Sequence, residues 1–182
     1  MGNRVSLAAV VVLVLFGTAL AACRTQAPPK SGDALSALLG QRTRTAGCKA
    51  NDGLPDGACT PGEIIPSATR EQICQPGYSK KVRDVSDQEK DQVYAEYGIT
   101  SHRSGQYEVD HLVSLELGGS NDIANLWPEP AEPRPGFHEK DQVENYLHDQ
   151  VCSGALSLAE AQHQIASNWL AVYQKMPRKS RR

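Results

Sequence analysis

The first 22 residues constrain this chain most strongly, because they place a short apolar segment behind a basic start. Arg4 precedes an apolar run over 7–22 that only Gly17 and Thr18 interrupt. The run is shorter than the roughly 20 apolar residues that a membrane-spanning helix needs. A basic lead, a short apolar core and small residues at its end are typical of an export signal. We therefore expect residues 1–22 to be removed and the rest of the chain to leave the bacterial cytoplasm.

The export signal ends in the tetrad Leu-Ala-Ala-Cys at 20–23, which resembles the bacterial lipobox. In that motif the peptidase cuts before a cysteine that carries diacylglycerol, so the resemblance implies a lipid anchor on Cys23. An ordinary signal peptide with an incidental cysteine and N-myristoylation, whose loose pattern fits residues 1–6, stay open as alternatives. Arg24 follows the cysteine instead of the aspartate associated with inner-membrane retention. The expected location is the cell envelope, with the outer membrane or the periplasmic face favoured if the cell has two membranes.

Removal of the signal leaves about 160 of the 182 residues, enough for one domain with its own core. The signal carries one arginine and no acid, so the formal net charge changes from -2 to -3. This balance shows no overall basic excess, and any contact with nucleic acid must be local. We expect a lipid anchor and flexible tether at 23–45, a domain at 46–174 and a basic tail at 175–182. The tail is equally consistent with a solvated end and with a contact to nucleic acid or anionic lipid.

Four cysteines follow the proposed lipidation site, and an even set in an oxidising compartment predicts two disulfides. Three pairings are possible. We favour Cys48–Cys59 and Cys74–Cys152, because the second would join the two halves of the domain. A zinc site is the alternative, although no pair has the Cys-x-x-Cys spacing that structural zinc prefers. Turn-forming glycine, proline and aspartate crowd the segment 51–62 and predict a loop-rich, bridged lobe.

Capping boxes predict two helices that we interpret as structural. Ser86 with Glu89 opens one that ends at Gly98. Ser157 with Glu160 opens another, whose apolar residues recur at helical spacing.

The candidate chemistry lies in residues 107–128, a β-rich stretch with a glycine pair in its middle. Asp110 and His111 are adjacent, Gly118-Gly119 follows, and Asn125 precedes a leucine. Together with a helix behind them, these motifs resemble the ββα-metal finger of the HNH nucleases. The likeness covers roughly 59–170 and extends to a group of small exported bacterial proteins of HNH type.

The resemblance implies an α+β domain with a ββα-metal core and a defined set of roles. His111 would be the general base that activates water, Asp110 a metal ligand, and Asn125 a supporting catalytic residue that pins the hairpin loop or helps at the metal. Imidazole can take a proton near neutral pH. A carboxylate oxygen suits a divalent ion, with Mg²⁺ favoured and Mn²⁺ or Zn²⁺ as alternatives. A hydrogen-bonded core histidine beside a turn-capping aspartate is the structural alternative.

A helix predicted from Gly136 supplies the other candidate metal ligands. His138 lies at its start, and Asp141 or Glu144 can substitute, since related nucleases present a carboxylate from this helix. Lys140 and Glu144 also have the i, i+4 spacing of an ordinary surface ion pair. The chain departs from the commonest HNH form, because it has neither a histidine pair at three-residue spacing nor cysteine pairs around the motif.

Arg83, Arg103 and Lys140 are candidate contacts to substrate phosphates. The expected function is a metal-dependent endonuclease that hydrolyses DNA or RNA with little sequence specificity, because no base-reading element is visible. The alternative is a non-catalytic envelope lipoprotein that uses a degenerate finger as a binding or structural scaffold. A wall hydrolase would also suit the location, but a recognisable carboxylate pair or zinc triad is missing from the sequence.

Overall fold

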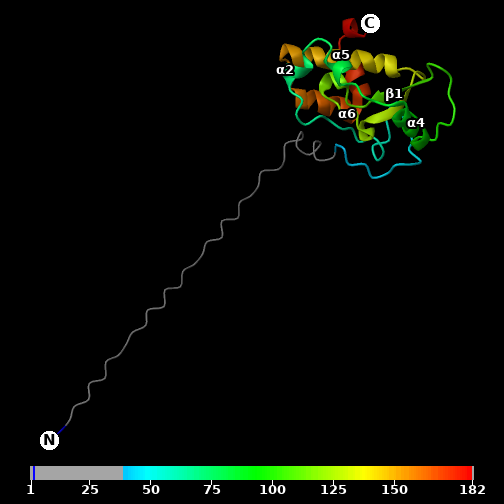
Figure 1. Ribbon diagram of the computed structural model, residues 1–182. Helices are drawn as coiled ribbons and strands as arrows, with labels where there is room; N and C mark the ends of the chain where they lie inside the picture. Colours follow the sequence, from blue (N-terminus) through cyan, green and yellow to red (C-terminus); the bar gives the residue numbers. More distant parts are fainter. Residues whose placement is uncertain (1, 3–38, 182) are drawn as a thin grey trace.

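The computed structural model describes residues 2 and 39–181 of the chain. The predicted signal peptide, the lipidation of Cys23 and most of the tether therefore lie outside the described residues. The described part is an α+β fold, as predicted, in which helices surround one small sheet (Figure 1). Its elements are α2 (Arg70–Ile73), α3 (Tyr78–Val82), α4 (Asp87–Glu96), β1 (Tyr107–His111), β2 (Leu126–Pro130), α5 (Phe137–Ser153) and α6 (Leu158–Lys175), with 3-10 turns η1 (Leu115–Leu117), η2 (Ile123–Asn125) and η3 (Arg178–Ser180).

The two helices predicted from capping boxes are confirmed at their starts. In α4 the Ser86 hydroxyl accepts from Glu89 N at 3.2 Å, and the Glu89 carboxylate accepts from Ser86 N at 2.8 Å. In α6 the Ser157 hydroxyl accepts from Glu160 N at 3.2 Å. Each contact satisfies an amide that the first helical turn leaves unpaired, so these short motifs define where the helices begin.

The sheet consists of β1 and β2, which pair antiparallel with Asp110 opposite Trp127 and His111 opposite Leu126. Only the two ends of the predicted β-rich stretch form strands, and the residues between them form a loop with two 3-10 turns. Position 119 in this loop requires glycine, because a Cβ there would lie 1.8 Å from the carbonyl oxygen of Val113. The loop thus folds back tightly behind the end of β1.

The core lies between α5 and α6, which run side by side (Figure 1). Val143, Leu147 and Val151 are buried on α5, as their spacing by four residues predicts. Ile165 and Trp169 on α6 are fully buried in the same cluster. α5 packs its apolar face against α6, and Lys140 in its first turn contacts the end of β1.

Two disulfides staple the fold, and both match the favoured pairing. Cys48–Cys59 closes the loop-rich lobe, and Cys74–Cys152 joins the end of α2 to the last turn of α5. The second bond links segments that are 78 residues apart in the chain. Within residues 2 and 39–181, none of the helices has the length and apolar character to cross a membrane.

Candidate functional site

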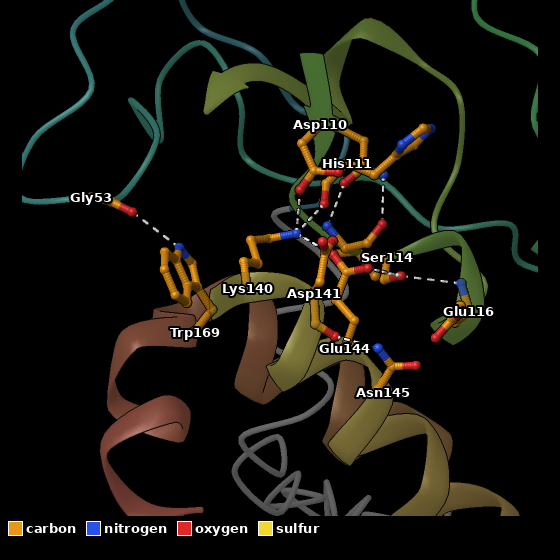
Figure 2. A network of polar contacts seen from close by, with 12 residues as sticks. Gly53, Asp110, His111, Ser114, Glu116, Lys140, Asp141, Glu144, Asn145 and Trp169 are labelled. Carbon is orange, nitrogen blue, oxygen red and sulfur yellow. Dashed lines mark hydrogen bonds and ion pairs between the residues drawn. The ribbon is translucent and has the colours of Figure 1, made fainter. Parts of the chain in front are cut away.

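The centre of the candidate site is the side chain of Lys140, which enters from the first turn of α5 (Figure 2). Its Nζ donates to Asp110 Oδ2 at 2.6 Å, to the carbonyl oxygen of His111 at 2.7 Å and to Glu144 Oε1. An ammonium has three N–H donors, and these three acceptors use them all. The Lys140 side chain is completely buried, so its ammonium group is the cation at the centre of the site.

The charges at this centre depend on one another. Although burial opposes both shifts, the carboxylates of Asp110 and Glu144 raise the pKa of Lys140, and the Lys140 ammonium lowers the pKa of Asp110. Burial raises the pKa of Glu144 to about 7, against the attraction of Lys140. Glu144 also accepts from the Ser114 hydroxyl at 2.8 Å. Lys140 and Asp110 therefore form a charged pair at neutral pH, while Glu144 lies near its titration point.

Glu129 is a buried acid at this site that the sequence reasoning missed. It lies on β2, opposite Glu108 in the register, and its carboxyl lies within hydrogen-bonding reach of the Asp110 carboxyl, a contact that requires a proton on one of the two acids. Burial raises the pKa of Glu129 well above its ordinary value, and the charge of Asp110 adds to this. The direction of this shift favours the protonated, neutral form of the Glu129 acid. Glu129 lies just beyond the predicted β-rich stretch 107–128, and β2 continues through it to Pro130.

His111 ends β1 beside Asp110, and 1% of the residue is exposed. Its Nε2 lies 3.1 Å from the side-chain oxygen of Asn121, and its Nδ1 has no partner among the described residues. Burial lowers the pKa of His111 to about 4, although the Asp110 carboxylate opposes the shift. The imidazole is therefore neutral at pH 7 and retains a lone pair. The sequence reasoning left Asn121 out, and its position just after the glycine loop was the only available signal.

Asn125 holds the loop between the strands rather than facing the charged centre. Its amide makes four hydrogen bonds to main-chain atoms: to Val113 N at 2.8 Å, Val113 O at 2.9 Å, Ser120 O at 2.8 Å and Glu63 N at 3.3 Å. These contacts pin the loop to both of its ends. Of the two supporting roles expected for Asn125, the structure has the pinning one.

The predicted metal ligands do not form a ligand group in the described residues. His138 is exposed and its ring packs 4.2 Å from that of Phe137. Asp141 is exposed, and partial burial of its carboxyl and the charge of Asp110 raise its pKa. Between Asp110 and Glu144 the oxygen atoms converge on Lys140, so a divalent ion does not fit there while that ammonium is in place.

A different group in the described part of the chain does bring three ligand atoms within 4.8 Å of one another. It consists of Cys74, His148 and Cys152. The two sulfur atoms are joined in a disulfide, which leaves no thiolate to bind a metal. The alternative of a zinc site built from the four cysteines therefore has no support in this fold.

The three candidate phosphate contacts lie in different surroundings. Arg83 and Arg103 are exposed. Burial raises the pKa of Glu108 and of Asp141 and lowers that of His111, and the positive charge of Arg83 acts on all three groups, which places Arg83 near the site. Arg103 lies in the loop before β1. Lys140 differs from the expected surface position, because its three N–H groups are already bound inside the protein.

Stability is expected to fall in acid because of His111. The unfolded imidazole has a pKa near 6.5 and the folded one about 4, so the unfolded state binds the proton more tightly. The resulting stabilisation is fully present above pH 6.5 and is lost as the pH falls to 4. The loss is about 3 kcal/mol. Urea unfolding of the wild type and His111→Gln at pH 8 and pH 4 measures it.

The variant matters because the raised pKa values of Glu129 and Glu144 act in the opposite direction. Those two groups favour the folded state at low pH in both proteins, so only the difference between the proteins reports His111. The same pH dependence in wild type and His111→Gln would contradict the neutral, buried imidazole.

Comparison with protein-family models, with curated proteins and with solved structures finds no significant match to this chain.

Proposed function

We propose that this chain is an HNH-type endonuclease that hydrolyses phosphodiester bonds of DNA or RNA with little sequence specificity. The observation that carries the proposal is His111, a neutral imidazole with an unpartnered Nδ1 beside Asp110 at the end of β1. The order of two antiparallel strands and a helix, β1, β2 and α5, supports it, because the ββα-metal finger has this order. The described residues show an α+β arrangement, and its assignment to that finger is part of the proposal.

In the proposed reaction His111 acts as the general base. Its lone pair takes a proton from the attacking water while the water oxygen bonds to phosphorus, the bond from phosphorus to one sugar oxygen breaks, and that leaving oxygen takes a proton from solvent. Asn125 keeps the loop between the strands in place, and Arg83 offers positive charge to the phosphate. The lowered pKa keeps the His111 imidazole neutral at working pH, and it also makes the ring a weaker base than an ordinary histidine.

The proposed cofactor is a divalent ion, with Mg²⁺ favoured over Mn²⁺ and Zn²⁺. The carboxylates of Asp110 and Glu144 are already bound to Lys140, so we assign no step of the reaction to a metal. The proposed location is the bacterial cell envelope, with a lipid on Cys23 as the membrane anchor. The substrate there would be environmental or incoming nucleic acid.

A non-catalytic scaffold is the second candidate, and two observations favour it. The His111 side chain is almost completely buried, and the Lys140 ammonium neutralises the acids that a metal would need. In this alternative the charged centre stabilises the end of β1 against α5, and the exposed surface binds a partner.

The deciding experiment is digestion of plasmid DNA and of RNA by the purified protein. Reactions contain Mg²⁺, Mn²⁺, Zn²⁺ or EDTA, and they compare the wild type with His111→Ala. Loss of the general base is expected to slow cleavage by at least about a hundredfold. His163→Ala, on α6, is the matched control and should cleave like the wild type. Equal cleavage by wild type and His111→Ala would remove His111 from the mechanism, and absence of cleavage in every condition would favour the scaffold.

A further inference from the structure

The side chain of Asn121 is held in one orientation by the main chain near the end of α3. Its Nδ2 donates to the carbonyl oxygen of Val82 at 2.7 Å, and its Oδ1 accepts from Asp84 N at 3.2 Å. A carbonyl can only accept and an amide N–H can only donate, so these two contacts distinguish the oxygen from the nitrogen of the Asn121 amide. The oxygen therefore faces His111 Nε2, at 3.1 Å.

We propose that Asn121 is a positioning residue that fixes His111 as the Nε2–H tautomer and so places the ring lone pair on Nδ1. An amide oxygen accepts but does not donate, hence Nε2 must carry the hydrogen to make the observed contact. Nδ1 is then the only ring atom that can accept a proton. It is also the ring nitrogen without a partner among the described residues.

The same contacts tie the base to Arg83. Val82 and Asp84 flank Arg83 in the chain, and Asn121 binds the main chain of both. The segment that carries a candidate phosphate contact and the ring that carries the base are thus fixed to one side chain. This coupling deepens the proposed nuclease function and depends on it for its catalytic meaning, whereas the tautomer can be measured without any activity.

The test is ¹H–¹⁵N correlation NMR of the histidine rings at pH 8, with His111 assigned by its loss in His111→Gln. The wild type should show a single Nε2–H tautomer with an unprotonated Nδ1. Asn121→Leu removes the acceptor, and the two ring nitrogens should move towards the averaged shifts of a tautomer mixture. Asn121→Asp keeps the Oδ1 acceptor for Nε2–H but loses the donor to the Val82 carbonyl, so it should retain the Nε2–H tautomer while the contact with Val82 is lost.

Activity provides the second measurement. Loss of one hydrogen bond that selects the tautomer should lower kcat of the Asn121→Leu protein about tenfold with KM unchanged. Gln88→Leu, an exposed residue on α4, is the matched control and should alter neither the ring shifts nor kcat.

Two results would overturn the positioning role. One is an Nδ1–H tautomer of His111 in the wild type, which does not depend on the folding of any Asn121 variant. The other is an unchanged Nε2–H tautomer in a folded Asn121→Leu protein. If the tautomer changes as expected but the wild type cleaves no nucleic acid, the positioning role stands and the nuclease function fails. If cleavage depends on His111 while Asn121→Leu leaves the tautomer unchanged, the nuclease function stands and the positioning role of Asn121 fails.

Discussion

Lys140→Met is expected to lower the free energy of unfolding by about 3–5 kcal/mol, because it removes one partner from a buried ionic cluster. Methionine fills a similar volume, so the packing of α5 against β1 is largely kept. The carboxylate of Asp110 and the carbonyl oxygen of His111, in contrast, lose a buried donor. Urea unfolding at pH 7, followed by tryptophan fluorescence, measures the effect through buried Trp127 and Trp169.

Lys90→Met is the matched control for this change. Lys90 also pairs with an acid, Asp87, but the pair lies on the exposed face of α4. Such surface pairs contribute little, so its loss should change stability by no more than about 0.5 kcal/mol.

A compensated variant separates charge from packing at the same site. In Lys140→Met combined with Asp110→Asn and Glu144→Gln, no charge is left unpaired, so part of the lost stability should return. If Lys140→Met costs no more than Lys90→Met, or if the two amide substitutions make it worse, the buried ion cluster does not contribute as described.

The helices could be predicted from the sequence because their signals are local. Ser86 and Ser157 lie next to the amides that they cap, and Val143 and Leu147 are one helical turn apart. Each signal needs only its own segment to take effect. The favoured disulfide pairing was also correct, and it rested on the weaker idea that a long-range bond should join the two halves.

The charged centre could not be predicted, because it arises where β1 meets α5. The i, i+4 spacing of Lys140 and Glu144 is equally typical of a surface pair. What buries Lys140 is the end of β1, which lies 29 residues earlier and contributes the Asp110 carboxylate and the His111 carbonyl. Glu129 was concealed for the same reason, since its burial follows from cross-strand pairing and not from its own neighbours. The residues on the hairpin were recognised, but their partners come from elsewhere in the fold.

Loss of the Cys74–Cys152 bond should destabilise the protein more than loss of Cys48–Cys59. A disulfide restricts the unfolded chain, and the restriction grows with the logarithm of the loop that it closes. The sequence separations are 78 and 11 residues. Double substitution to alanine should therefore cost about 4.5 kcal/mol for the first bond and about 3 kcal/mol for the second.

The burial of the cysteines predicts the opposite order of the two stability losses. Cys48 and Cys59 are more deeply buried than Cys74 and Cys152, so native packing alone would make the short-loop pair the costlier one to replace. Urea unfolding of the two double variants under non-reducing conditions decides between these causes. A larger loss for Cys48→Ala/Cys59→Ala would mean that the bridged lobe contributes through its packing. A larger loss for Cys74→Ala/Cys152→Ala would mean that the bond between α2 and α5 stabilises the domain by holding distant parts of the chain together.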